Sequence, residues 1–356
     1  MGTGTRRFTT AAAGAVLLLA ACNPSPPTER AAPSPSPTTA SIEEFPAFPQ
    51  GRLSEDTSID LQAVLDDAID AGTVRAATAA VAVASVGNWS GAAGVDHRSD
   101  TPMQPDAVLE IASIAKTMTA AAVMRLVEQG LIGLDDNASQ HLPAGYGRLE
   151  VNGIRVRDLL GMRSGLRDPY SFDAILLSGG TGANVLDAAA TSGPAPADVE
   201  YANLNYLLLG ELVAHVTGKP QHLALQVLLE GQDLVGMTLV PAYEGAEDDW
   251  DTQSDSASLA RWGYALYGGH VLAPASLDEM TSFQGQWYGL GTIDYSHPDA
   301  AIFAPAGIGH GGQGSVETTV MVVFPERATA VAILALGGEL EDLGPLATAL
   351  SQAALR

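Results

Sequence analysis

The 356-residue sequence predicts an α+β fold, in which an antiparallel sheet is flanked by terminal helices and an all-helical subdomain is inserted. Strand-like segments lie at both ends of the folded region, at about 76–95 and 318–335, whereas helical patterns dominate about 113–290. The simplest packing pairs the N- and C-terminal strands in one sheet. A ligand-binding cleft is then expected between the sheet and the helical subdomain.

Local patterns place the individual elements. Helical patterns occupy six segments, which are residues 59–71, 113–129, 156–160, 204–216, 256–267 and 343–354. Strand patterns occupy four segments, which are residues 76–86, 88–95, 318–324 and 329–335. Gly87 joins the first pair of strands and Pro325-Glu326-Arg327 joins the second, so the members of each pair are expected to be neighbours in the sheet.

The N-terminus has the organisation of an export signal followed by a tether. Residues 1–21 combine Arg6 and Arg7 with an apolar stretch too short to span a bilayer, and Leu19-Ala20-Ala21-Cys22 resembles a bacterial lipobox. Cys22 is the single cysteine of the chain, which favours lipid attachment there over a core thiol. Residues 22–52 are rich in Pro, Ser and Thr and are expected to form a tether, with the folded domain at 53–356.

This organisation predicts a protein that is lipid-anchored to the bacterial cell membrane on its extracytoplasmic face. The arginines at positions 6 and 7 leave both Sec and Tat export open. The net charge of −24 disfavours nucleic acid as a partner, because phosphate would be repelled. Seven histidines without ligand spacing and one cysteine predict no metal site, and no cofactor is implied.

One lysine is placed where it could activate a nucleophile. The chain has only two lysines, and Lys116 follows Ser113 by three residues on a predicted helix, so the two side chains share one face. A lysine kept neutral by burial can accept the proton of a serine hydroxyl. The alternative is an exposed lysine on a helix surface.

Two further segments carry polar groups that suit the same chemistry. Tyr201 could shuttle a proton if a nearby cation lowered its pKa, and Asn203 could orient a substrate. In the segment from His310 to Gln313, Gly312 allows close approach of a ligand. The backbone N–H of Gln313 could there complete an oxyanion hole with that of Ser113. The alternatives are a tyrosine packed at a helix start and an ordinary glycine turn.

In this order, Ser-x-x-Lys, Tyr-x-Asn and His-x-Gly resemble the motifs of the penicillin-recognising serine hydrolases, most closely the class C β-lactamase-related branch. Residues 127–136, 159–166 and 288–292 are similar to further segments of that family. The resemblance implies a β-lactamase/transpeptidase-like fold in which Ser113 is the acyl-accepting nucleophile and Lys116 activates it. It also implies that Tyr201 shuttles a proton, that Asn203 orients substrate and that His310 stands where many members have lysine.

The departures from the family pattern bear on the substrate. A histidine at position 310 is expected to titrate near neutrality, which weakens the case for holding a substrate carboxylate. Met162-Arg163 also replaces the usual His-x pair. The expected activity is acyl transfer to water from an ester or amide, with a peptidoglycan peptide, a D-amino-acid ester or a lactam as substrate. The alternative is a catalytically weak penicillin-binding-like lipoprotein with a binding or regulatory role.

Overall fold

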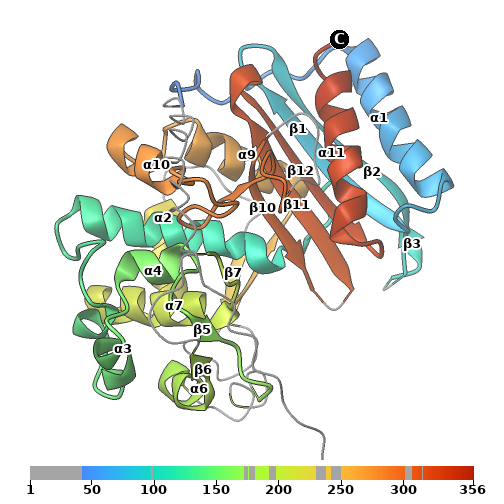
Figure 1. Ribbon diagram of the computed structural model, residues 1–356. Helices are drawn as coiled ribbons and strands as arrows, with labels where there is room; N and C mark the ends of the chain where they lie inside the picture. The colour runs from blue at the N-terminus through green and yellow to red at the C-terminus, as the bar shows by residue number, and fades with distance from the viewer. Residues whose placement is uncertain are drawn as a thin grey trace, which may run out of the picture. The chain divides into compact units, whose positions relative to one another are not determined.

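The computed structural model describes residues 42–97, 99–171, 175, 181–191, 198–229, 238–241, 250–300, 307–314 and 316–356 (Figure 1). The expected signal segment 1–21, the lipidation site Cys22 and the tether up to residue 41 lie outside the described residues.

The centre of the folded unit is a seven-stranded antiparallel sheet, in the order β3-β2-β1-β12-β11-β10-β9 (Figure 1). Its strands are β1 (Ala76–Val83), β2 (Gly87–Asp96), β3 (Thr101–Pro102), β9 (Ile293–Asp294), β10 (Ile308–Gln313), β11 (Glu317–Phe324) and β12 (Thr329–Leu336). Strand β1 pairs with β12 along its whole length, from Ala76 opposite Leu336 to Val83 opposite Thr329. The predicted pairing of the N- and C-terminal strands, and with it the α+β class, is confirmed.

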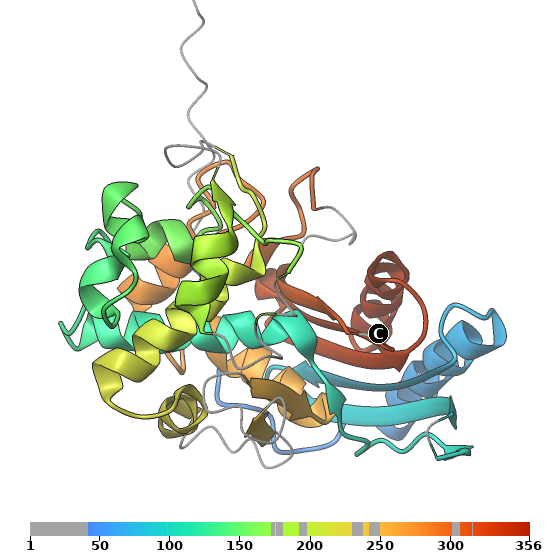
Figure 2. The ribbon, with the colours of Figure 1, turned by 90° about the horizontal axis from the view of Figure 1, so that it is seen from below.

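Helices cover both faces of this sheet (Figures 1 and 2). Helices α1 (Glu55–Asp70) and α11 (Leu340–Ala353) lie side by side on one face, and α9 (Ser256–Tyr267) packs against β1, β11 and β12 on the other. Asp255 begins α9 because its carboxylate accepts the N–H of Ser258. Helix α9 lies within the segment 113–290 that was predicted as the helical subdomain, but it packs against the sheet.

The inserted region is mainly but not entirely helical. Its helices are α2 (Ala115–Glu128), α3 (Gly147–Val151), α4 (Val156–Leu160), α6 (Gly182–Ala188), α7 (Asn203–Thr217), α8 (Gln221–Leu229) and α10 (Pro274–Met280). Short strands accompany them, which are β4 (Leu109–Glu110), β5 (Leu166–Arg167), β6 (Ala190–Thr191), β7 (Thr238–Pro241) and β8 (Trp250–Ser254). The prediction of an all-helical insertion was wrong in this detail, because strands of two to five residues are too short to show a clear alternation in the sequence.

The folded region begins earlier than residue 53. Phe45 is buried, and its ring and that of Phe48 meet the ring of Tyr264 edge-on at centroid distances of 5.2 and 5.3 Å. The Tyr264 hydroxyl donates a hydrogen bond to the carbonyl of Pro46. The last part of the predicted tether is therefore bound to α9. Nothing in the sequence indicated this contact, because the segment is rich in proline and the partners of the two phenylalanines are more than 200 residues away in the chain.

Within the described ranges, no helix has the length and apolar character needed to cross a membrane.

Candidate active site

Ser113 lies in a tight turn immediately before α2. The turn is the 3₁₀ segment Ala112–Ile114, and Ala112 has a φ of 46°, in the left-handed region that a residue with a side chain seldom adopts. Ile111, just before the turn, is fixed by two contacts: its N–H donates to the carbonyl of Thr252, and its carbonyl accepts from the Thr319 hydroxyl. The chain therefore presents the serine from a strained and well-anchored backbone.

Lys116 and Ser113 are in direct contact, as the spacing of the motif predicts. Lys116 Nζ lies 2.9 Å from Ser113 Oγ and 2.9 Å from Asn203 Oδ1. Burial lowers the pKa of Lys116 to about 8, although the charge of Asp168 acts in the opposite direction. With this pKa, about one lysine in ten is neutral at pH 7 and can accept a proton.

Tyr201 completes the contacts around the serine hydroxyl. Its hydroxyl is hydrogen-bonded to Ser113, and Lys116 Nζ lies 5.2 Å from the centre of its ring. Desolvation raises the pKa of Tyr201 to about 12; the bond to Ser113 opposes this rise, and the charge of Asp168 adds to it. The expected lowering of this pKa was therefore wrong. Tyr201 is 40 % exposed, so solvent limits the size of the rise, but its direction leaves the phenol neutral at pH 7.

His310 lies on β10 and is almost completely buried, at 1 % exposure. Burial lowers its pKa to about 3, and the nearby charge of Lys116 adds to the shift. The Gly311 carbonyl, 2.6 Å from Nδ1, can only accept, so Nδ1 carries the proton and Nε2 accepts from the Tyr288 hydroxyl at 3.2 Å. The expectation that His310 titrates near neutrality was therefore wrong, because the ring is held neutral inside an aromatic cluster.

The glycines after His310 form part of a strand and not a turn. Strand β10 runs beside the turn that carries Ser113, and a Cβ on Gly312 would lie 2.3 Å from the carbonyl oxygen of Ile111. Gln313 ends the strand, and its side-chain amide donates to Glu339. The oxyanion hole made by the backbone N–H groups of Ser113 and Gln313 stays a prediction, favoured by the packing of β10 against this turn.

Asp168, which the sequence reading did not single out, accepts three hydrogen bonds at the start of α7. Its Oδ2 accepts from the backbone N–H of Asn203 at 2.8 Å and from Asn203 Nδ2 at 3.1 Å, and its Oδ1 accepts from the N–H of Leu204 at 2.8 Å. The residue is 35 positions from Asn203 in the chain, so no local capping pattern could have shown the contact.

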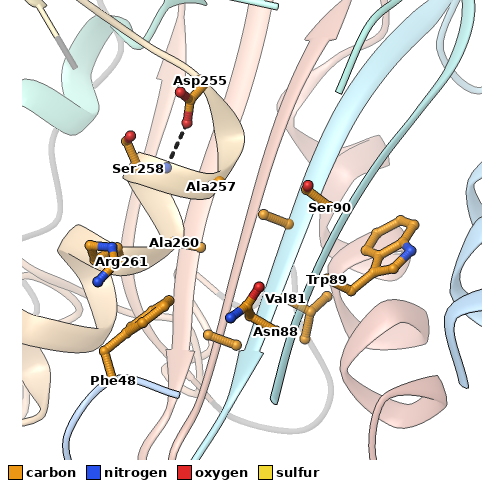
Figure 3. A pocket seen from close by; sticks show the side chains of 12 residues that line it. Phe48, Val81, Asn88, Trp89, Ser90, Asp255, Ala257, Ser258, Ala260 and Arg261 are labelled. Atoms are coloured by element: carbon orange, nitrogen blue, oxygen red, sulfur yellow. Dashed lines mark hydrogen bonds between the residues drawn. The ribbon is translucent and has the colours of Figure 1, made fainter. Parts of the chain in front are cut away.

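A separate cavity of about 290 Å³ lies between α9 and strands β1 and β2 (Figure 3). Its polar lining includes Asn88, Ser90, Asp255 and Arg261. Neither serine of its lining has a lysine or histidine beside it there, so this cavity lacks the means to activate a nucleophile. Among the described residues, no cluster of His, Cys, Asp and Glu suits a metal ion.

Comparison with curated proteins gives partial matches. Penicillin-binding protein 4 of Amycolatopsis lactamdurans is 31% identical over 139 residues, which are 36% of this chain and 35% of that protein. Protein flp of Staphylococcus aureus (strain N315) is 28% identical over 121 residues, which are 32% of this chain and 24% of that protein. The chain thus spans about a quarter to a third of the length of these relatives.

Comparison with solved structures extends over nearly the whole folded unit. The D-amino acid amidase of Ochrobactrum anthropi SV3 superposes with a TM-score of 0.70 at 21% identity, covering 84% of this chain and 98% of that one. A D-stereospecific amidohydrolase from Streptomyces sp. gives a TM-score of 0.64 at 23% identity, with coverage of 84% and 97%. The family model described as Beta-lactamase matches residues 61–355. With Ser113, Lys116, Tyr201 and His310 gathered at one site, the chain belongs to the Beta-lactamase family.

Proposed function

We propose that this protein is a serine hydrolase that cleaves amides or esters through an acyl-enzyme on Ser113. The observation that carries the proposal is the 2.9 Å contact between Lys116 Nζ and Ser113 Oγ, at a site where burial lowers the pKa of the lysine to about 8. A lysine with this pKa acts as a base near neutral pH, whereas an exposed lysine does not. Membership of the Beta-lactamase family supports the same chemistry.

The contacts assign a role to each group in the first half of the reaction. Neutral Lys116 takes the proton of Ser113 while Oγ bonds to the carbonyl carbon and the carbonyl oxygen becomes negative. As the intermediate collapses, the bond to the leaving nitrogen or oxygen breaks. The leaving group takes a proton from Tyr201, which recovers one from the Lys116 ammonium. Tyr201 is suited to donate, because its raised pKa keeps it protonated.

The second half of the reaction repeats these steps with water. A water molecule gives a proton to Lys116 and attacks the acyl carbon. As this intermediate collapses, the bond to Ser113 Oγ breaks, and Oγ takes a proton from Tyr201, which recovers one from the Lys116 ammonium. The backbone N–H groups proposed to bind the negative oxygen, those of Ser113 and Gln313, would stabilise both intermediates.

The state of His310 bears on the substrate. A neutral ring bonded to Tyr288 and Gly311 offers no positive charge to a carboxylate. Penicillins and D-Ala-D-Ala peptides carry a carboxylate beside the scissile bond. We therefore place uncharged leaving groups, such as simple amides and esters, ahead of lactams and carboxypeptidase substrates.

The solved relatives suggest which acyl group to test first. The two structural relatives described above are a D-amino acid amidase and a D-stereospecific amidohydrolase. An α-ammonium group on such a substrate would also be attracted by the net charge of −24. D-amino-acid amides and esters are thus the proposed substrate class, with peptidoglycan stem peptides as the next candidates.

The proposed location is the outer face of the cytoplasmic membrane, through a lipid on Cys22. The support is the lipobox-like Leu19-Ala20-Ala21-Cys22 and the Pro-rich segment that follows it. Changing Cys22 to Ser should move the protein from the membrane fraction to the soluble fraction of the producing bacterium. Retention in the membrane fraction would contradict the proposal.

Active-site labelling tests the proposed chemistry. A fluorescent fluorophosphonate should label the wild type and fail to label Ser113→Ala, while a fluorescent penicillin should label weakly or not at all. Equal labelling of both proteins would contradict a role for Ser113. Labelling without release of product from any amide or ester would instead favour the binding or regulatory lipoprotein.

A further inference from the structure

We propose that Asp168 is a positioning residue of the proposed hydrolase, which fixes the side-chain amide of Asn203 so that its oxygen faces Lys116. The inference rests on the proposed function. Asp168 lies between β5 and α7 and belongs to none of the three motifs that resemble the family.

The geometry shows how the amide is oriented. Asn203 Nδ2 donates to Asp168 Oδ2 at 3.1 Å, while Asn203 Oδ1 accepts from Lys116 Nζ at 2.9 Å. A flip of the amide would point its oxygen at the carboxylate and its NH₂ group at the lysine, and both contacts would be lost. The carboxylate thus decides which end of the amide the lysine meets.

Asp168 also fixes the backbone that carries the amide. Helix α7 begins after Ala202, which has no capping side chain, and Asp168 accepts the N–H groups of Asn203 and Leu204 in its place. One side chain therefore holds the first turn of α7 and the amide that projects from it.

Contacts made by neighbouring residues fix the position of Asp168 relative to α7. The N–H of Glu200 donates to the carbonyl of Met162, and Arg167 forms an ion pair with Glu200. The Ser164 hydroxyl is bonded to the buried amide of Asn205. The segment from Met162 to Asp168 is therefore bound along the start of α7 at several points.

The charge of Asp168 acts on the pKa of Lys116, so the proposed role can be tested by measuring that pKa. The other titratable groups that face Lys116 are Tyr201, Tyr206 and His310. Raised pKa values keep both phenols neutral, and a lowered pKa keeps the imidazole neutral. Among the described residues, the charge that acts on the pKa of Lys116 is that of Asp168, which raises it.

The first test compares Asp168→Asn with a matched removal of charge at the cap of another helix. Asp255→Asn removes the charge from the residue that caps α9, whose carboxylate accepts from Ser258 N at 2.6 Å (Figure 3). Asp168→Asn should lower kcat for a chromogenic ester on the order of tenfold. It should also shift the increase of activity with pH to lower pH, because the pKa of Lys116 falls. Asp255→Asn should leave kcat and the pH profile unchanged. If Asp168→Asn, like Asp255→Asn, changes neither kcat nor the pH profile, Asp168 is no more than a helix cap.

A double-mutant comparison separates positioning from folding. If Asp168 acts through Asn203, then Asp168→Asn should reduce kcat much less in an Asn203→Ala background than in the wild type. Equal reductions in both backgrounds would overturn the proposal.

A second measurement does not depend on turnover. The chain has two lysines, Lys116 and Lys219, so lysine-selective ¹⁵N labelling of the full chain gives two ammonium signals, which Lys219→Arg assigns. The pKa of Lys116 should be lower in Asp168→Asn than in the wild type and unchanged in Asp255→Asn. An unchanged pKa in Asp168→Asn would overturn the inference. An inactive wild type with the expected pKa shift would instead contradict the proposed function alone.

Discussion

Lys116 Nζ lies 2.9 Å from Ser113 Oγ and shares its other hydrogen bond with Asn203 Oδ1. A neutral lysine that donates to the amide oxygen directs its lone pair toward the serine hydroxyl. Tyr201, which is hydrogen-bonded to the same hydroxyl, stays protonated because its pKa is raised. The geometry and the two pKa values together assign the base to the lysine and the proton donor to the tyrosine.

The assignment of Lys116 as the base predicts a specific pH profile. Its pKa is lowered to about 8, so the active neutral form increases with pH, and log kcat/KM should rise with unit slope below about pH 8 and level off above it. Lys116→Arg should lose about 10²- to 10⁴-fold in kcat/KM, because arginine stays charged. A rise centred near pH 6.5 would instead indicate a histidine base.

Tyr201→Phe keeps the ring and removes the proton donor. The stacked contact with Trp287, at a centroid distance of 6.4 Å, would remain. Hydrolysis of amides should fall by about 10²-fold or more, and that of esters with good leaving groups should fall less, since these need less protonation. Tyr264→Phe is the control, because its hydroxyl donates to the carbonyl of Pro46 and not to a group of the site. Equal losses for the two substrate types would contradict a donor role.

His310 should make the fold sensitive to acid. Its pKa is about 3 in the folded protein and near 6.5 when unfolded, so the unfolded state binds more protons between these values. Stability that is present above pH 6.5 should therefore be lost as the pH falls toward 3, by at most about 5 kcal/mol.

Urea denaturation at a series of pH values measures this loss. His310→Gln should flatten the dependence, and His215→Gln, which changes an exposed residue of α7, should not. An unaltered slope in His310→Gln would show that other groups cause the acid sensitivity.

Gly312 should tolerate no side chain. A Cβ there would lie 2.3 Å from the Ile111 carbonyl oxygen and 2.6 Å from the Thr319 hydroxyl, both of which hold the turn before Ser113. Gly312→Ala should cost about 1–3 kcal/mol of unfolding free energy and also lower kcat, because the turn must shift. Gly314→Ala, whose Cβ would approach no atom more closely than 3.4 Å, should change neither. Identical behaviour of the two variants in thermal unfolding and kinetics would contradict this packing argument.

Features with a local signature could be predicted from the sequence. The strands that form β1, β11 and β12 are long apolar runs, and Ser113 and Lys116 are one helical turn apart, so pattern and spacing were sufficient. The order of the motifs also predicted which distant residues would gather at the site.

Features that depend on distant contacts could not be predicted in this way. Asp168 caps a helix from 35 residues away, and Phe45 reaches the core through α9. The pKa of Tyr201 and that of His310 depend on burial, which a motif does not specify. In both cases desolvation outweighed the charge or the ordinary titration expected from residue type alone.

The central claim is that Ser113 becomes acylated with Lys116 as its base. The most direct measurement is intact-protein and peptide mass spectrometry of the enzyme, quenched in acid within the first turnover of a chromogenic ester. The account predicts an added acyl group on the peptide that contains Ser113, forming faster at pH 8 than at pH 6 and absent from Ser113→Ala. Hydrolysis of the ester with no adduct on that peptide, or with equal activity in Ser113→Ala, would contradict it.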